Sequence, residues 1–559
     1  MKKTILTGAS ILALSMAAPA FAQSVSDVDQ DGNANSATVG QTGSNDSDID
    51  QTGDNLTATV TQSSTGNDAN IIQTNRFNEA EIDQSGTNGI ATITQNGDGE
   101  DANKRNQALV TQAGNSAEAV VTQEGNDRND AEVNQNGDSF AQILQTGVSQ
   151  EAEAWQTGDG NDAFITQNGN SNQVGNALNA SAAGVVQTGD NNFANVDQDP
   201  STYSTAGINQ FGDSNIANIR QEQRGGAGAG RSFATIGQTG DLNDATINQL
   251  TDDRPARQDA SILQSGTSND ATTNQTGQDN DSTVDQDGTS NESTLTQQGN
   301  LALANIEQDG TGNISNATQG SPNRLTGSQT FGLTQNGTDN RSTLTQFGSE
   351  NSATVNQDGE RNTSTVTQPG FDNDVAGLTT AGINQIGDDN TSTVTQGAQF
   401  GLVSVDQIGD VLTSTVTQEG RANDAIADVD QFGSNNTSTI LQTAPAPADG
   451  GPGRQMTANV IQDGSGNVSD ISQTNTLGDP PVSGNLAEVD QSGTGNFSDI
   501  DQDGHENETD VTQSGSLADS LIIQSGNNNS ATVTQSGNTD ISDINQNGTG
   551  NIASVTQGL

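Results

Sequence analysis

The sequence contains no cysteine and a single histidine, His505. A disulfide framework, a thiolate metal site, a cysteine nucleophile and a histidine-rich metal site are therefore excluded. Aromatic residues make up 3% of the chain and apolar residues only 28%. Sixteen Lys and Arg stand against 71 Asp and Glu, a formal net charge of −55 that argues against nucleic acid and anionic membranes as partners. Composition alone predicts disorder.

Long hydrophobic runs are also missing, except near the start of the chain. Lys2 and Lys3 precede an apolar segment, residues 5–18, and residues 20–22 (AFA) have the small-x-small form of a cleavage site. This arrangement predicts a secretory signal peptide over residues 1–22, because the apolar run is too short for a membrane anchor. We therefore expect residues 23–559 to be secreted by a bacterium, without membrane insertion.

Glutamine recurs along the rest of the chain. There are 44 such marks from Gln30 to Gln557, and 30 of the 43 intervals between them are eleven residues long. The unit reads Q-x-G-x-x-N-x-[A/S]-x-[V/I/L]-x-Q. Asn, Ala/Ser, Val/Ile/Leu and Gln alternate with Thr, Asp, Asn and Ser, which places the first set on one face of a strand. The glycine after each Gln predicts a tight turn, so each unit is a short strand followed by a turn.

The irregular intervals indicate that the structural period is 22 residues. When the marks are numbered in order, eleven intervals are longer than eleven residues, and each of them follows an odd-numbered mark. The nine prolines after the signal peptide lie in these same intervals. Insertions and proline are tolerated in exposed turns but not in a paired strand. The sequence therefore predicts an all-β solenoid of about 22 rungs, with two strands per rung and all long loops along one edge. At about 4.8 Å per rung the rod would be roughly 105 Å long.

Stacked rungs place identical side chains above one another, as in cross-β assemblies. We expect Gln, Gly and Asn to form structural ladders, with small apolar side chains between the two sheets. Representative ladder positions are Gln286, Gly288, Asn291 and Gln297, then Gln346, Gly348, Asn351 and Gln357, and finally Gln546, Gly548, Asn551 and Gln557.

This unit resembles the curlin repeat of curli fibre subunits, which stack as strand-turn-strand β-solenoids. Residues 210–217 (QFGDSNIA) show the pattern, and the resemblance covers nearly all of residues 24–559. It implies self-association into amyloid fibres at the cell surface, with a role in adhesion and biofilm matrix. It also implies other curli-like subunits as partners and export through an outer-membrane curli-type pore. The chain departs from the usual curli subunit in having more repeats and no Gly-rich segment before the first one.

Two surface patterns support an alternative, a monomeric acidic solenoid. Asp-x-Asp pairs at positions 27/29, 48/50 and 499/501 stack like charges, so weak calcium binding remains an alternative to a rod without cofactors. The G-G-x-G-x-D repeat of calcium-binding β-rolls is absent. Thr-x-Thr pairs at 343/345, 365/367, 393/395 and 415/417 are typical of ice-binding solenoids, and equally of ordinary exposed strands. A monomeric solenoid normally caps its terminal strands, and the repeats here leave no residues for a cap.

Positive charge is unevenly distributed. Of the 14 Lys and Arg after the signal peptide, eleven lie in odd-numbered turns: Arg76, Lys104, Arg105, Arg128, Arg224, Arg231, Arg254, Arg257, Arg324, Arg421 and Arg454. We call this the basic ridge. Its candidate contact residues are Arg224, Arg231, Arg254 and Arg257, which would meet the acidic face of another rod or an anionic polysaccharide. The alternative is an edge that merely tolerates insertions.

No catalytic motif stands in its required context, because each Gly-rich piece belongs to a repeat turn. The sequence therefore predicts a non-enzymatic structural protein with no catalytic, cofactor or metal site.

Overall fold

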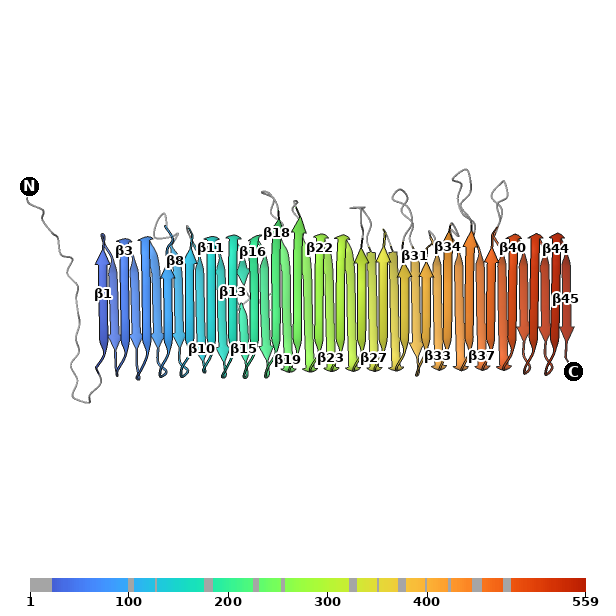
Figure 1. Cartoon of the computed structure of the whole chain (residues 1–559), viewed down its shortest axis with the longest axis horizontal. Helices are drawn as coiled ribbons and strands as arrows, with labels where there is room; N and C mark the ends of the chain where they lie inside the picture. The colour runs from blue at the N-terminus through green and yellow to red at the C-terminus, as the bar shows by residue number, and fades with distance from the viewer. Residues whose placement is uncertain are drawn as a thin grey trace, which may run out of the picture.

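The computed structural model describes residues 23–98, 105–125, 128–174, 184–224, 231–252, 257–320, 329–348, 351–369, 379–397, 400–420, 424–444, 455–475 and 484–558. Its strands lie across the long axis of a straight rod (Figure 1). None of the described residues forms a helix long and apolar enough to span a bilayer. The predicted signal peptide lies outside the described residues.

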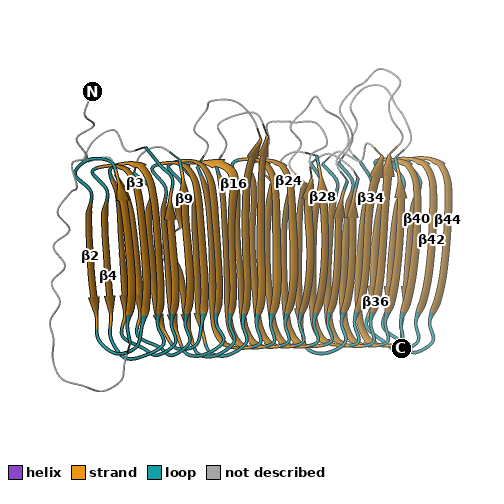
Figure 2. Ribbon diagram, turned by 60° about the vertical axis from the view of Figure 1, so that its left-hand side comes forward, coloured by secondary structure: helices purple, strands orange, loops and turns teal. Residues whose placement is uncertain are grey.

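Successive strands alternate between two parallel sheets, which face each other and are joined by turns at both long edges (Figure 2). The first sheet, sheet A, contains β1 (Val25–Asp31), β3 (Asp46–Asp54), β5 (Asp68–Arg76), β7 (Ile90–Gln95), β9 (Glu118–Glu124), β11 (Phe140–Val148), β13 (Asp162–Asn170), β16 (Phe193–Thr202), β18 (Ile216–Arg224), β20 (Asp244–Asp252), β22 (Asp270–Gln278), β24 (Glu292–Asn300), β26 (Ile314–Gly320), β28 (Arg341–Phe347), β30 (Thr363–Gln368), β32 (Thr391–Gln396), β34 (Thr413–Gly420), β36 (Thr437–Ala444), β38 (Val468–Thr474), β40 (Phe497–His505), β42 (Asp519–Asn527) and β44 (Ile541–Thr549).

The second sheet, sheet B, contains β2 (Ser36–Gln41), β4 (Thr57–Gln62), β6 (Asn78–Gln84), β8 (Asn106–Gln112), β10 (Asp130–Asn136), β12 (Glu151–Thr157), β14 (Gln173–Val174), β15 (Val185–Thr188), β17 (Thr205–Phe211), β19 (Ser232–Asp241), β21 (Gln258–Thr267), β23 (Asn280–Thr289), β25 (Ala302–Thr311), β27 (Gln329–Thr338), β29 (Asn351–Glu360), β31 (Thr379–Ile386), β33 (Leu402–Asp410), β35 (Ile426–Ser434), β37 (Thr457–Ser465), β39 (Leu486–Thr494), β41 (Glu508–Gln513), β43 (Ser530–Gln535) and β45 (Ile552–Gln557).

Each strand pairs with the next strand of its own sheet, one rung further along the rod. In sheet B, for example, β21 pairs with β23 so that Gln264 lies beside Gln286 and Gly266 beside Gly288. The β14 and β15 segments share one rung, so the strands form 22 rungs of two strands each. The predicted two-strand solenoid and its 22-residue period are therefore confirmed.

The core is the thin space between the two sheets. Inward positions hold Ala or Ser and then Val, Ile or Leu, and the alternation of buried and half-buried residues runs along nearly every strand. The largest fully buried side chain is Phe331, and most of the others are isoleucines. Because each rung buries little apolar surface, stability depends on many neighbour contacts in series.

Ten of the eleven longer connections join a strand of sheet A to the next strand of sheet B, as predicted. The eleventh, after Gln167, is not at this edge, and the prediction that all long loops share one edge is wrong there. Asn172 makes a turn of ordinary length, and Val174 pairs with Ala152 on β12. Pairing with β12 resumes at Val185, which lies beside Ala154. Because Gln173 and Val174 already pair with β12, the extra residues of this interval fall between two parts of one strand and not in the turn.

Candidate functional site: the polar ladders

Buried glutamines form two rows of hydrogen bonds along the rod. Gln286 Nε2 donates to Gln308 Oε1 at 2.7 Å, and Gln286 Oε1 accepts from Gln264 Nε2 at 2.9 Å. The same Nε2 also donates to the backbone oxygen of Asp270, in the facing sheet, at 3.0 Å. Each amide therefore satisfies its buried polar atoms while joining neighbouring rungs and the two sheets.

The other representative glutamines make corresponding contacts. Nε2 donates to Oε1 of the next rung from Gln297 to Gln319 at 3.0 Å, from Gln346 to Gln368 at 2.8 Å, from Gln357 to Gln385 at 2.8 Å, from Gln524 to Gln546 at 2.8 Å and from Gln535 to Gln557 at 2.9 Å. The donor always belongs to the earlier rung, so both rows run in one direction along the rod.

The turn glycines approach one another too closely for a side chain. Gly288 has a φ of +121°, and a Cβ placed on it would lie 2.0 Å from the carbonyl oxygen of Gly310 on the next rung. Gly348 and Gly548 have φ values of +99° and +118°. A positive φ together with a backbone contact of this kind restricts a turn such as that of Gly288 to glycine.

Asparagines close the turns. The backbone N–H of Asn291 donates to Asn269 Oδ1 at 3.1 Å, and its own Oδ1 accepts from the N–H of Asn313 at 3.0 Å. Its Nδ2 donates to the oxygens of Asp287 and Gly310. At the other two representative positions, Asn351 Nδ2 donates to Phe347 O at 2.7 Å and the Asn551 N–H donates to Asn529 Oδ1 at 3.1 Å.

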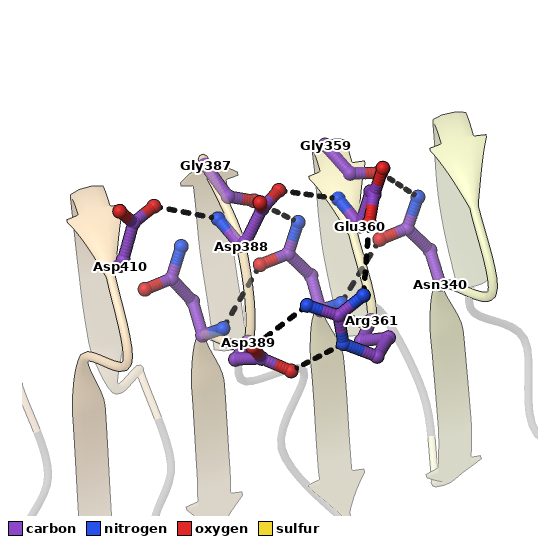
Figure 3. A network of polar contacts seen from close by, with 10 residues as sticks. Asn340, Gly359, Glu360, Arg361, Gly387, Asp388, Asp389 and Asp410 are labelled. Carbon is purple, nitrogen blue, oxygen red and sulfur yellow. Dashed lines mark hydrogen bonds and ion pairs between the residues drawn. The ribbon is translucent and has the colours of Figure 1, made fainter.

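Charged side chains extend this network on the outside of the turns (Figure 3). Arg361 contacts both carboxylate oxygens of Asp389, at 2.7 and 2.9 Å, and also Glu360 at 2.8 Å. Asp388 Oδ1 accepts the N–H of Glu360, and Asp410 Oδ1 accepts the N–H of Asp388. The Arg361 guanidinium lowers the pKa of the Asp389 carboxyl, because it stabilises the charged form.

For stacked carboxylates on the sheet faces, the pKa is raised instead of lowered. Burial, then the charges of Asp470, Asp501 and Asp519, raise the pKa of Asp499. The largest shift is at Glu153, where burial and then Glu132, Glu151 and Asp130 raise the pKa to about 7. Glu153 Oε2 is buried and has no hydrogen-bond partner within the described chain. These faces are therefore stabilised by protons or screening ions.

The part of the chain that the structure describes contains no preformed metal site. No group of three or more His, Cys, Asp and Glu side chains in it is arranged to hold an ion. The predicted stacking of Asp-x-Asp pairs is present at the start of the rod, where Asp27 lies beside Asp48 and Asp29 beside Asp50.

Several arginines of the basic ridge form ion pairs within their own chain. Arg76 pairs with Asp98 at 2.9 Å, Arg105 with Glu79 at 2.9 Å, and Arg257 with Asp259. Arg224 ends β18, and Arg231 precedes β19. Arg128 lies in the turn before β10 with a φ of 61°. The other five members, Lys104, Arg254, Arg324, Arg421 and Arg454, lie outside the described residues. A contact role for Arg224, Arg231, Arg254 and Arg257 stays a prediction.

Two features of the ladders were not predicted from the sequence. One is the hydrogen bond from each glutamine to the backbone of the facing sheet. The length of the side chain is the sequence signal for it, because an asparagine amide at this position would be too short to reach that sheet. The other is the left-handed residue two positions after each turn glycine, such as Arg361, Asp389 and Val411 with φ values of 56°, 59° and 58°. Residue type varies at that position, so the sequence carries no clear signal for it.

Together, the two parallel sheets and the continuous Gln rows define a cross-β repeat protein of the β-solenoid class. Five segments, residues 138–169, 259–288, 328–359, 483–515 and 526–558, match the family described as the curlin associated repeat. The chain therefore carries the curlin repeat, and the predicted resemblance is confirmed. A search of curated proteins finds no match to the chain.

Proposed function

We propose that this protein is an extracellular, non-enzymatic structural subunit that polymerises end to end into curli-like amyloid fibres. Its role would be in adhesion and biofilm matrix outside a bacterium, with other curli-like subunits and an outer-membrane curli-type pore as further partners. The curlin repeat is a structural family, which supports this class of function. The stronger support comes from the two ends of the rod.

Both terminal rungs of the described structure present open strand edges. All residues of β1 are exposed, including Val28, which occupies an inward position but is 40% exposed. At the other end, Ala553 and Val555 of β45 are only half-buried, whereas the corresponding residues of interior strands are buried. Unpaired edges of this kind recruit further strands.

The two ends also match each other in sequence, and this match is the observation that carries the proposal. If β1 of a second copy continued sheet A after β44 in the same register, Ser26 would lie beside Ser542, Val28 beside Ile544 and Gln30 beside Gln546. In sheet B, β2 would place residues 37, 39 and 41 (Ala, Val and Gln) beside residues 553, 555 and 557 (Ala, Val and Gln). Gln546 Nε2 would then donate to Gln30 Oε1, which continues the direction of the row.

The test blocks one end without disturbing the rod. Outward residues donate their N–H groups toward the following rung, as Asp519 does to Asp540 and Ser530 to Asn551. In β44 and β45 the N–H groups of the outward residues Asp543 and Ser554 therefore point to the open edge. The double variant D543P/S554P removes these donors, and proline is tolerated on an edge strand whose N–H faces solvent.

We expect purified residues 23–559 to form thin fibres that bind amyloid dyes, seen by electron microscopy, and D543P/S554P to form no fibres while its circular dichroism is unchanged. A matched control, D543N/S554T, keeps both N–H groups and should polymerise like the parent chain. If the parent chain stays monomeric for days at low pH and high salt, the fibre proposal fails and the monomeric acidic solenoid replaces it.

A further inference from the structure

Threonine side chains form a continuous array on the outer surface of sheet A. One column runs in register from Thr296 to Thr417 over six successive strands, a second from Thr343 to Thr439 over five, and a third from Thr363 to Thr437 over four. We call these three columns, on β24 to β36, the threonine face. The rod is straight along this stretch (Figures 1 and 2), so the three columns run parallel to its long axis.

The chemistry of the threonine face is uniform. Its side chains are half-buried, with methyl and hydroxyl groups at the surface. Among the described residues, no hydrogen bond joins these hydroxyls to another protein group. Neighbouring columns lie about 6.6 Å apart and neighbouring rungs about 4.8 Å apart, as the strand geometry requires.

Charge distinguishes this face from the rest of the rod. From β26 to β36 the outward positions of sheet A hold two charged residues, Arg341 and Glu419, each at an end of its strand, in a chain whose net charge is −55. On the opposite sheet the same stretch includes Asp406, Asp428 and Asp430 on β33 and β35. Two rods that met through most other surfaces would bring carboxylates together, which is costly, whereas the threonine face carries no such penalty.

We propose that two copies of the chain pack threonine face against threonine face about a two-fold axis. A two-fold contact requires a self-complementary surface, and rows of identical β-branched side chains interdigitate in the way that paired sheets do in steric zippers. The 15 threonines of the three columns cover about 480 Å² per rod, or about 960 Å² for the pair, which is in the range of weak interfaces.

This pairing does not require polymerisation, but polymerisation would strengthen it. In an end-to-end fibre the face recurs about every 105 Å along the rod, so two aligned fibres make the same weak contact many times. Single rods are then expected to pair weakly, and fibres to run in stable pairs. Salt should favour pairing, because it screens the carboxylates at the edges of the two rods.

The experiment compares two variants, each of which adds one negative charge to the outer surface of one sheet. Thr365 lies at the centre of the threonine face, so T365E places two carboxylates against the paired surface. Thr354 is an exposed residue of sheet B flanked by Gly332 and Gly382, so T354E adds the same charge without a charged neighbour in its own sheet. T365Q adds the same bulk without charge. Each variant is made in the parent chain and in D543P/S554P, where rods cannot grow.

In the blocked rods, sedimentation equilibrium should show pairing in the parent and T354E, and pairing weakened at least about tenfold in T365E because of like charges across the contact. T365Q should weaken it less. In the unblocked chain, electron microscopy should show paired fibres for T354E and single fibres for T365E. Single fibres in T365E would also show that the variant folds and that end-to-end growth is independent of the face.

Three results would overturn the proposal. If the face is the contact, T365E pairs more weakly than T354E, so equal pairing of the two variants refutes the proposal. Rods of the parent chain that stay single at high salt also refute it. If those single rods inhibit ice recrystallisation and T365E does not, the partner of the face is an ice lattice instead of a second copy. If the rods pair but the unblocked chain forms no fibres, only the proposed function is refuted.

Discussion

The turn glycines show how a single residue sets the spacing of the whole rod. Parallel rungs lie about 4.8 Å apart, and at Gly288 the next backbone occupies the space where a Cβ would stand. A side chain there would force the rungs apart locally and interrupt the hydrogen bonds on both sides. Glycine is therefore required in this turn by contact as well as by conformation.

Gly288→Ala tests this requirement. We expect the variant to lose at least about 2 kcal/mol of stability, because the conformation alone costs about 1–3 kcal/mol for a residue with a side chain. Urea denaturation, with hydrogen exchange in β23 and β25, measures the effect. The control is Gly332→Ala on β27, where a Cβ would have nothing within 4 Å and the change should be neutral or slightly stabilising. Equal losses in the two variants would contradict the contact argument.

Much of this residue-level structure could be predicted from the sequence. The alternation around Gln286 predicted its inward position, and the spacing predicted that Gln stacks on Gln. Backbone conformation two residues after the turn glycine could not be predicted, because Arg361, Asp389 and Val411 occupy it equally. The pairing of Arg361 with Asp389 depends on that conformation and on the neighbouring rung, neither of which a single repeat contains.

At the scale of the strand, the glutamine rows connect elements that apolar contacts alone would hold weakly. Gln286 joins β23 to the preceding and following strands of its sheet and to β22 in the facing sheet. The apolar side chains between the sheets are mostly Ala, Val and Ile, so the amide supplies direction and register that these side chains do not. Satisfied buried networks of this kind specify a single arrangement.

Gln286→Leu should therefore destabilise the rod in spite of its greater hydrophobicity. It leaves Gln264 Nε2 and Gln308 Oε1 each without a ladder partner, and each buried unsatisfied group costs about 1–3 kcal/mol. We expect a loss of about 3 kcal/mol in urea denaturation. Gln557→Leu, at the exposed end of the same row, should cost less than about 1 kcal/mol. A neutral effect of the interior change would show that apolar packing alone sets the register.

The carboxylates of the sheet faces make stability depend on pH. The pKa of Glu153 is raised from its usual value of 4.5 to about 7, so the folded state binds this proton more tightly than the unfolded state. Its contribution to stability is complete below about pH 4.5 and is lost as the pH rises through 7. Burial also raises the pKa of Asp130 and Glu132 on the neighbouring strand, which acts in the same direction.

We therefore expect the melting temperature of the rod to fall between pH 5 and pH 8. Glu153→Gln should raise the melting temperature at pH 8 and reduce this pH dependence. Asp389→Asn should give no such gain, because Arg361 lowers the pKa of that carboxyl. A melting temperature that rises with pH over this range would contradict the argument.

The sequence predicted the elements well because each repeat carries the same local signals. It failed at β14 and β15, where the interval after Gln167 is long but the turn itself is ordinary. Interval length alone cannot show whether extra residues enter at the turn or within the strand. Only the pairing of Val174 and Val185 with β12 distinguishes the two.

At the scale of the whole molecule, the rod is a one-dimensional stack in which each rung contacts only its neighbours. Its stability is then close to a sum over rungs and over the interfaces between them. The number of rungs could be predicted from the sequence, since it follows from counting glutamines. The threonine face arises at this scale as well, because strands as distant as β24 and β36 must lie in register before their side chains form columns.

Deletion of one complete rung should consequently be tolerated. Removal of residues 276–297 takes out β23 and β24, so that β25 stacks on β21 and β26 on β22 with every Gln, Gly and Asn still over its counterpart. We expect a rod shorter by about 4.8 Å, with a melting temperature close to that of the parent chain. Small-angle scattering and thermal denaturation measure the two quantities.

The control removes half a rung, residues 287–297. Gln286 in sheet B would then be followed by the turn that precedes β25, so every later strand would change sheet. The long connections beyond this point would move to the opposite edge of the rod, and the strands of the threonine face would join sheet B. We expect a clearly lower melting temperature for this smaller deletion. If eleven residues can be lost as easily as 22, the two edges are equivalent and the rung is not the unit of the fold.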